Sequence, residues 1–128
     1  MPSLEKFCLR WNGFQENVNS SFSNMRKDNS LCDVTLACED GYQVEAHKVI
    51  LAAASPLFVN ILTRNKHTHP LIYMKGFKSE ELEDLLDFVY YGEANIFEDK
   101  LETFLAFGEE LKLKGLEGGR PMGKLRKT

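Results

Sequence analysis

The side chains of this sequence that could do chemistry are few, and the first candidates are two histidines in one polar stretch. His67 and His69 are separated by one residue, a spacing that would place both imidazoles on one side of a strand and let them chelate a metal ion. However, Lys66 adjoins them, and no carboxylate occurs between Ala46 and Ser79 to complete a ligand set. The stretch therefore favours a solvated loop, and a metal-dependent enzyme that uses these histidines is kept only as an alternative.

Nucleophilic and phosphate-binding chemistry has little support in the sequence. The three cysteines, Cys8, Cys32 and Cys38, are odd in number and scattered, so they predict neither a disulfide framework nor a closed zinc site. A reducing intracellular environment is the simplest interpretation of their number, and in strand-like runs such thiols behave as small apolar side chains. The sequence contains no Gly-rich phosphate loop and no Gly-x-Ser-x-Gly turn. We therefore predict no enzyme, no cofactor and no bound metal.

A third group of candidate residues is charged. Asp33 begins an apolar run with strand character, and His47 and Lys48 begin an apolar run with helical character. A carboxylate among apolar neighbours needs a cation or several hydrogen-bond donors. Two interpretations stay open: an ion pair between Asp33 and Lys48 that joins the strand to the helix, or a charged pocket of Asp33, His47 and Lys48 that binds a peptide.

Length and charge limit what can position these residues. The 128 residues, 43% hydrophobic and 27% charged, suit one globular domain. The longest apolar run, 49–54, is too short to cross a membrane. Residues 1–111 carry 10 basic and 18 acidic side chains, whereas residues 112–128 carry 6 basic and 1 acidic. We expect one domain over 1–116 and a flexible basic tail or linker over 117–128, where phosphate contact or a targeting role is the alternative to simple solvation.

Two apolar stripes begin the chain. Residues 7–11 alternate apolar and polar, a pattern typical of a half-buried strand, and after Gly13 the apolar spacing changes to that of one helical face. The strand stripe consists of Phe7, Leu9 and Trp11, and the helical stripe consists of Phe14, Val18, Phe22 and Met25. The remainder of this helix is rich in Asn and Ser, which are mediocre helix formers. The helix must therefore be stabilised by packing of its stripe on this chain or on another.

The middle of the chain predicts a hairpin followed by two helices. Residues 32–38 and 42–46 have strand character and flank a Glu-Asp-Gly turn. Residues 49–54 are apolar on every side, as in a helix buried at the centre of a small domain. Ser55 as the N-cap and Pro56 at the first helical position then begin a second helix.

The last third of the chain predicts a short strand over 71–74, a helix capped by Ser79 and ended by Gly92, an extended piece over 94–96 and a final helix. Gly108 inside the final helix suggests a close backbone approach. Because unpaired strand edges recruit other strands, both extended pieces are candidate contact sites. Their residues are Leu71, Ile72, Tyr73, Met74, Ala94, Asn95 and Ile96. The predicted fold class is α+β, a helical cluster flanked by a small, mostly antiparallel sheet.

Several segments together form a recognisable pattern. Cys-Asp-Val-Thr-Leu at 32–36 and Val-Glu-Ala-His-Lys-Val-Ile-Leu-Ala-Ala-Ala-Ser-Pro-Leu-Phe at 44–58 strongly resemble the BTB (POZ) domain family. Leu-Asp-Phe-Val-Tyr-Tyr-Gly-Glu at 86–93 is similar to that family's helix ending in Tyr-x-Gly. Phe-Cys-Leu-Arg-Trp-Asn at 7–12 and Leu-Lys-Gly-Leu at 113–116 resemble the Tramtrack-type group of insect transcription factors.

The resemblance implies a protein–protein interaction domain that forms an intertwined dimer, with the N-terminal strand of each chain joining the sheet of the other. The two stripes at the start of the chain would then form the dimer interface. It also implies association into higher multimers, related BTB domains and corepressor proteins as further partners, and a nuclear location. Any DNA binding would belong to other parts of a longer protein. The sequence departs from the group at Gly13-Phe14, where Asn-His is usual, and at Phe107-Gly108, where two alanines are usual.

The sequence therefore predicts a domain that oligomerises a nuclear transcription or chromatin regulator. The alternative within the same family is a substrate adaptor for a cullin-type ubiquitin ligase. Such adaptors usually carry a hydrophobic-x-Glu signal after the Pro-Leu-Phe helix, whereas here no glutamate occurs between Glu45 and Glu80.

Overall fold

The computed structural model describes residues 4–116, which form five helices and three strands. Within this part of the chain, no helix combines the length and the apolar character needed to cross a bilayer. In chain order the elements are α1 (Phe14–Asp28), β1 (Val34–Cys38), β2 (Gln43–Ala46), α2 (Lys48–Ala54), α3 (Pro56–Arg64), β3 (Leu71–Met74), α4 (Ser79–Tyr91) and α5 (Glu98–Glu110). Every helix and strand predicted from residue 14 to residue 91 is therefore present, as is the final helix, with ends shifted by a few residues.

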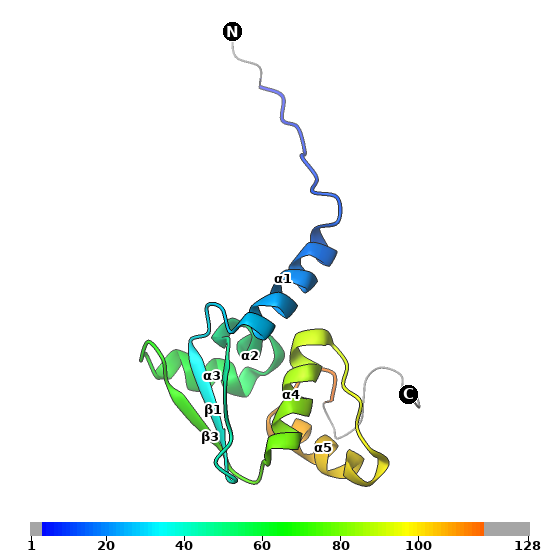
Figure 1. Ribbon diagram of the computed structural model, residues 1–128. Coiled ribbons are helices and arrows are strands. Elements are labelled where there is room, and N and C mark those ends of the chain that lie inside the picture. Colours follow the sequence, from blue (N-terminus) through cyan, green and yellow to red (C-terminus); the bar gives the residue numbers. More distant parts are fainter. Residues whose placement is uncertain (1–3, 117–128) are drawn as a thin grey trace.

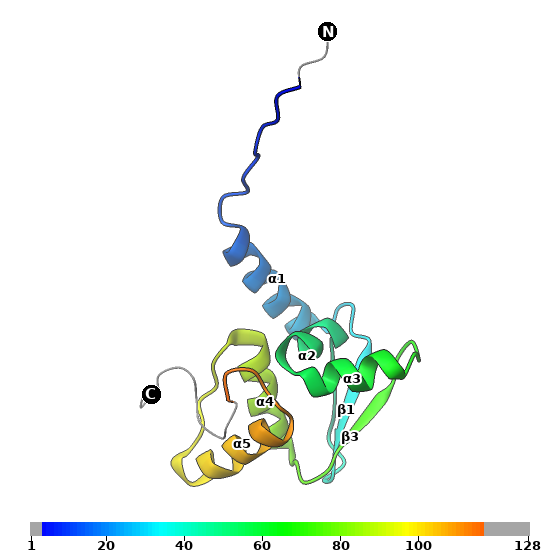
Figure 2. The same cartoon turned by 180° about the vertical axis from the view of Figure 1, so that it is seen from behind.

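The three strands form one small sheet in the order β2-β1-β3. β1 pairs antiparallel with β2, with Leu36 opposite Val44, and this confirms the predicted hairpin. β3 pairs parallel to β1, with Leu36 opposite Ile72, so the sheet is mixed, whereas the sequence predicted a mostly antiparallel one. The reason is the connection: α2 and α3 together form the crossover that a parallel pairing requires. Figures 1 and 2 show these two helices lying beside the sheet, with α4 and α5 at the other end of the body.

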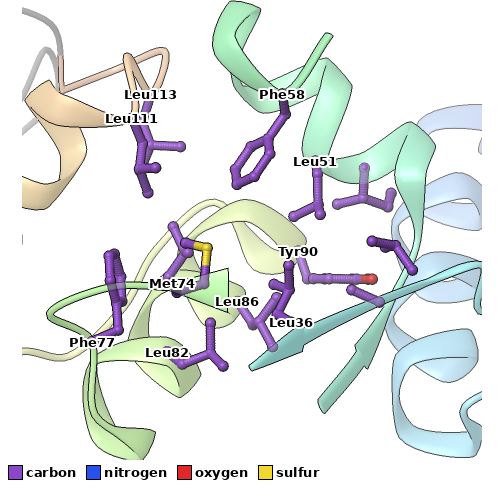
Figure 3. Close-up of a cluster of buried hydrophobic side chains, with 14 of the residues drawn as sticks. Leu36, Leu51, Phe58, Met74, Phe77, Leu82, Leu86, Tyr90, Leu111 and Leu113 are labelled. Atoms are coloured by element: carbon purple, nitrogen blue, oxygen red, sulfur yellow. The ribbon is translucent and has the colours of Figure 1, made fainter. Parts of the chain in front are cut away.

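The core lies where the sheet, the α2–α3 pair and the last two helices meet. In Figure 3, Leu51 and Phe58 point from the helix pair toward Leu36 of β1 and Met74 of β3, while α4 contributes a third wall. The largest fully buried side chains are Phe58, Leu36, Leu51, Leu82, Leu85, Leu86, Leu113 and Val34, together with the polar Ser55.

Two glycines have the roles that the sequence suggested. Gly92 ends α4 in the left-handed region, at φ 83°, which glycine adopts without steric cost. Gly108 of α5 lies under Leu116: a Cβ at this position would come within 2.7 Å of Leu116 Cδ1 and 3.1 Å of its Cβ. The close approach predicted at Gly108 is confirmed, and its partner is the segment that follows α5.

The helix pair α2–α3 confirms one local prediction and corrects another. Ser55 accepts a hydrogen bond from the Phe58 N–H at 3.2 Å, with Pro56 in the first helical position, as predicted. The expected burial of the first helix on every side is wrong, because Val49 is 66% exposed and Ala53 is also exposed. α2 packs against α3 and α4, so the face with Ile50 and Leu51 is buried and the face with Val49 is left exposed.

The start of α4 also differs from its prediction. Lys78, not Ser79, is the N-cap, and Ser79 is the first helical residue. The Glu81 carboxylate accepts a hydrogen bond from the Lys78 N–H at 3.2 Å, and Asp40 accepts one from the Ser79 N–H at 3.0 Å. Carboxylates at the N-terminus of the helix satisfy its free N–H groups and interact favourably with its dipole. One of these carboxylates comes from the β1–β2 turn, which a local sequence pattern does not reveal.

Candidate protein interaction surface

The N-terminal extension, defined here as residues 4–28, exposes an unusual density of apolar side chains. Residues 4–11 lie in no helix or strand and project away from the body, beyond the free end of α1 (Figures 1 and 2). Phe7 is 83% exposed, Leu9 95% and Trp11 60%. Trp11 contacts Phe14 edge to face, with ring centroids 5.1 Å apart, and Phe14 is itself 52% exposed. Contiguous exposed aromatic surface of this kind marks interaction sites in soluble proteins.

α1 itself is only weakly attached to the body. None of its fifteen residues is buried. Val18, Phe22 and Met25 are half-buried, and Phe22 packs against the edge of the core. Its first residue follows Gly13, which provides no side-chain cap. A helix with mediocre formers, no N-terminal cap and no buried residue has little stability of its own, so α1 depends on contacts near its C-terminal end and on whatever covers its exposed face.

One arginine near that C-terminal end attaches α1 to α4. The Arg26 guanidinium lies 2.8 Å from Asp87 Oδ1 and 3.5 Å from Glu83 Oε1. It also lies over the rings of Tyr90 and Tyr91, 5.4 Å and 5.1 Å from their centroids. Burial alone would lower the pKa of Arg26, but the hydrogen bond to Asp87 and the neighbouring negative charges hold it above its ordinary value. Arg26 therefore stays charged and bound to α4.

The predicted ion pair between Asp33 and Lys48 does not form. Asp33 Oδ1 accepts a hydrogen bond from the backbone N–H of Lys48 at 2.7 Å, so the carboxylate satisfies the first turn of α2. The Lys48 side chain points elsewhere and donates to the carbonyl oxygen of His67 at 2.8 Å. The physical reason is that the backbone N–H groups at a helix N-terminus are fixed donors close to the carboxylate. A hydrogen bond to them costs less side-chain entropy than an ion pair with a flexible lysine.

His47 is buried and fully occupied by hydrogen bonds. Its Nε2 lies 2.6 Å from the carbonyl oxygen of Ser30, and its Nδ1 lies 2.6 Å from the hydroxyl of Tyr90. The same hydroxyl accepts a hydrogen bond from the His47 backbone N–H at 3.0 Å. Burial raises the pKa of Tyr90 to about 12, so this hydroxyl keeps its proton at neutral pH. Asp33 and His47 thus make hydrogen bonds that join the start of α2 to the loop after α1 and to α4, and the binding of a peptide by Asp33, His47 and Lys48 stays a prediction.

The two histidines of the loop between α3 and β3 make separate contacts. His69 Nε2 lies 2.8 Å from the hydroxyl of Thr35 on β1, and His67 is engaged through its carbonyl oxygen by Lys48. Across residues 4–116, no three His, Cys, Asp or Glu side chains are grouped so that they could hold a metal ion.

The cysteines differ in exposure: Cys8 is exposed, Cys32 half-buried and Cys38 buried, and all three are free thiols. Burial, followed by nearby carboxylates, raises the pKa of Cys32 and of Cys38. These two thiols are therefore poor nucleophiles at neutral pH.

The two extended pieces proposed as contact sites differ in the structure. β3 is an edge strand whose Leu71 and Tyr73 are 56% and 57% exposed, while Met74 is buried in the core. A surface groove lies between this strand and the end of α3, and its lining includes Ile61, His67 and Tyr73. Residues 94–96, in contrast, belong to no strand of the described sheet, and Ile96 packs against the core. In the single chain this piece therefore pairs with no strand, and its contact with another chain stays a prediction.

Comparison with known proteins decides which family this geometry belongs to. The sequence model of the BTB/POZ domain matches residues 22–118. The chain is a BTB/POZ domain. The BTB domain of zebrafish PATZ1 has the same fold, with a TM-score of 0.74 at 20% identity over 87% of this chain and 91% of that one. The BTB domain of human gigaxonin is similar, with a TM-score of 0.72 at 23% identity over 90% of this chain and 94% of that one.

Three of the relatives by sequence are Drosophila melanogaster proteins, consistent with the Tramtrack-type resemblance. This BTB/POZ domain is 43% identical to the longitudinals lacking protein-like protein over 116 residues, 91% of each chain. It is 45% identical to the sex determination protein fruitless over 112 residues, 88% of this chain and 12% of that protein. It is 40% identical to the Broad-complex core protein over 116 residues, 91% of this chain and 16% of that protein. The chain thus spans nearly all of one relative and a small fraction of the other two.

Membership in the BTB/POZ family makes this chain a protein–protein interaction domain, so its working surface is the part that a partner can reach. The sequence predicted the apolar residues of the N-terminal extension as contact residues, and this stays a prediction. Sequence reasoning missed Arg26. The signal for Arg26 is present on another helix, where Glu83 and Asp87 are four residues apart and therefore share one face, but no sequence pattern links that face to α1.

Proposed function

We propose that this BTB/POZ domain links copies of itself, and thereby oligomerises a nuclear transcription or chromatin regulator. The observation that carries the proposal is the N-terminal extension, whose Phe7, Leu9, Trp11 and Phe14 are more than half exposed. Exposure of four large apolar side chains within eight residues is unfavourable in water. A second copy that covers them would remove this cost.

The proposed contact has two parts. The first is the stripe of α1, where Phe14, Val18, Phe22 and Met25 would pack against the same helix of the partner, since a two-fold interface uses the same surface on both chains. The second is the arm before it. Phe7, Leu9 and Trp11 alternate as in a strand, and an outer strand of the partner's sheet offers unpaired backbone groups to which such an arm can hydrogen bond.

Assembly beyond the dimer would use a separate surface. β3 is an outer strand of the sheet, and its exposed Leu71 and Tyr73 alternate with inward-facing residues. An arm that pairs with β2, the outer strand at the opposite edge of the sheet, leaves this edge available for further contacts. The same surfaces would admit related BTB domains or a corepressor protein as partners.

The regulatory part of the proposal rests on context. The chain spans only 12% of fruitless and 16% of the Broad-complex core protein, so in proteins of that kind most of the molecule lies outside the domain. Residues 1–111 are acidic overall, which disfavours direct contact with nucleic acid. Joining two or more copies would raise the effective concentration of whatever the remaining parts bind.

The test is the molar mass of the full chain, measured by light scattering on a size-exclusion column across a concentration series. We expect a dimer that persists at low concentration, since obligate interfaces bury more than about 2,000 Å². Trp11→Ala and Phe22→Ala should lower solubility or folding. A paired Phe7→Ser and Leu9→Ser variant changes only the projecting arm, so it should keep the body folded and weaken association.

Phe97→Ala is the matched control, because Phe97 is also an exposed aromatic residue, at 82%, but lies at the start of α5. Its dimer should be unchanged. A wild-type chain that is a folded monomer at every concentration would overturn the proposal, and so would a folded monomer of the Trp11→Ala or Phe22→Ala variant. Tight stoichiometric capture of a cullin would instead support the adaptor function.

A further inference from the structure

We propose that Arg26 is the positioning residue of the self-association surface: it sets the direction in which α1 leaves the body, and so decides whether two N-terminal extensions can meet. This inference rests on the proposed function and adds the residue on which its geometry depends. Arg26 is not part of the exposed stripe. Its side chain is only 14% exposed and faces α4.

Four groups hold the guanidinium from different sides. Asp87 and Glu83 accept its N–H groups from one face of α4, and the rings of Tyr90 and Tyr91 lie 5.4 Å and 5.1 Å from its centre. A planar guanidinium can donate in two directions and stack at the same time, whereas a lysine ammonium supplies one compact charge. The site therefore fixes both the position and the orientation of Arg26, and with it the last turns of α1.

A second series of hydrogen bonds and ring contacts fixes the loop that follows α1. Tyr90, under the guanidinium, also binds His47 at the start of α2, and His47 in turn reaches the carbonyl oxygen of Ser30 at 2.6 Å. The next residue, Leu31, has a left-handed φ of 61° and is 81% exposed. A leucine held in this unfavourable conformation indicates that the surrounding contacts determine the path of the loop.

The free end of α1 amplifies any change at this joint. Fifteen residues of α-helix are about 22 Å long, and Arg26 lies near one end while Phe14 lies at the other. Phe14 lies twelve residues from Arg26, about 18 Å along the helix, so a rotation of about 20° at the joint would move Phe14 by about 6 Å, which exceeds the distance over which apolar side chains stay in contact. Loss of the Arg26 contacts would therefore let α1 leave the body in many orientations, although every residue of the proposed interface would still be present.

The experiment compares dissociation constants of the full chain by sedimentation equilibrium for wild type, Arg26→Lys, Arg26→Met and the control Arg64→Met. Arg64 is an exposed arginine at the end of α3. We expect Arg26→Met to raise the dissociation constant by at least about tenfold, Arg26→Lys to lie between it and wild type, and Arg64→Met to match wild type. Hydrogen exchange of the β1 and α4 amides reports whether the body stays folded. Each dissociation constant is calculated from the concentration of folded chains alone.

A role in stability alone predicts that the constant per folded molecule is unchanged. That result for Arg26→Met, or for Arg26→Lys where the methionine variant does not fold, would overturn this inference and leave the proposed self-association intact. A monomeric wild-type chain would overturn the proposed function itself. The two failures are therefore distinguished by the wild-type sample.

Discussion

The N-terminal extension and the body, residues 34–116, treat their apolar residues in opposite ways. In the body, Phe58, Leu85 and Leu113 are no more than 1% exposed, and helices and sheet cover one another. In the extension, Leu9 is 95% exposed and no residue of α1 is buried. Both regions carry regular apolar patterns. Such a pattern by itself predicts only that the apolar face will be packed against another surface. Whether the cover comes from the same chain depends on the other elements available.

The difference also separates stability from association. A substitution inside the body should change the free energy of unfolding, with little effect on how folded copies associate. A substitution on the projecting arm, such as the paired Phe7→Ser and Leu9→Ser, should change association first, whereas Trp11→Ala and Phe22→Ala should also lower folding. The following variants test that separation, and each is measured both by denaturant unfolding and by molar mass.

The largest effect is expected from Phe58→Ala. Phe58 is 1% exposed at the meeting point of α3 and the sheet (Figure 3), and its removal leaves a cavity that the surrounding side chains fill only in part. Such truncations cost about 3–5 kcal/mol. Urea unfolding at fixed protein concentration should show a loss of this size, while the folded fraction keeps the molar mass of wild type.

The neighbouring Val59→Ala is the control, since Val59 is 41% exposed and should cost less than about 1 kcal/mol. Equal losses for the two variants would mean that the core is not centred on Phe58. A folded Phe58→Ala chain with altered association would show instead that the body and the extension are not separable.

An intermediate effect is expected from Gly108→Ala. The added methyl would come within 3.1 Å of Leu116 Cβ, and overpacking of this kind costs about 1–3 kcal/mol, more than the roughly 1 kcal/mol that alanine gains over glycine in a helix. The free energy of unfolding should therefore fall. Adding Leu116→Ala removes Leu116 Cδ1, which the new methyl would approach to 2.7 Å, so the double variant should lose less than the two single losses together. Strictly additive losses would contradict this contact.

The sequence was sufficient where a few neighbouring residues decide the structure. Ser55 with Pro56 predicted the start of α3, and Gly92 predicted the end of α4. The alternating and helical stripes predicted the hairpin and the core faces in the same way. Such features depend on local hydrogen bonds and on a periodicity that one segment contains completely.

It was insufficient where the partner comes from a distant part of the chain. The sequence left open whether Asp33 pairs with the side chain of Lys48 or lines a charged pocket, and the fold shows that its carboxylate accepts a hydrogen bond from the backbone N–H of Lys48. Val49 was predicted to be buried because its segment is apolar throughout, yet Ile50 and Leu51 are the buried residues of α2 and Val49 is 66% exposed. The contacts of Arg26 could not be predicted for the same reason, since the two carboxylates that it binds are 57 and 61 residues away along the chain.

The smallest effect is expected from Asp84→Asn, which tests the body at the helix that also receives α1. Asp84 lines a surface groove with Tyr42, Phe97 and Lys100. Burial, and then the charges of Asp87 and other α4 carboxylates, raise its pKa to about 6, above the ordinary value near 4. Between about pH 4 and 6 the folded chain therefore holds a proton that the unfolded chain releases, so this carboxyl makes the free energy of unfolding fall as the pH rises through that window.

Asp84→Asn should remove this fall and, because solvent screens part of the repulsion at a partly exposed site, raise the free energy of unfolding by about 1 kcal/mol at pH 7. Glu102→Gln, on an exposed part of α5, is the control and should leave the pH profile of wild type unchanged. Urea unfolding from pH 4 to pH 7 measures both variants. An Asp84→Asn profile parallel to that of wild type would contradict the assignment. A change in dimer dissociation without a change in unfolding would place Asp84 with the extension instead of the body, because a carboxylate that acts only within α4 has no means of altering association between folded chains.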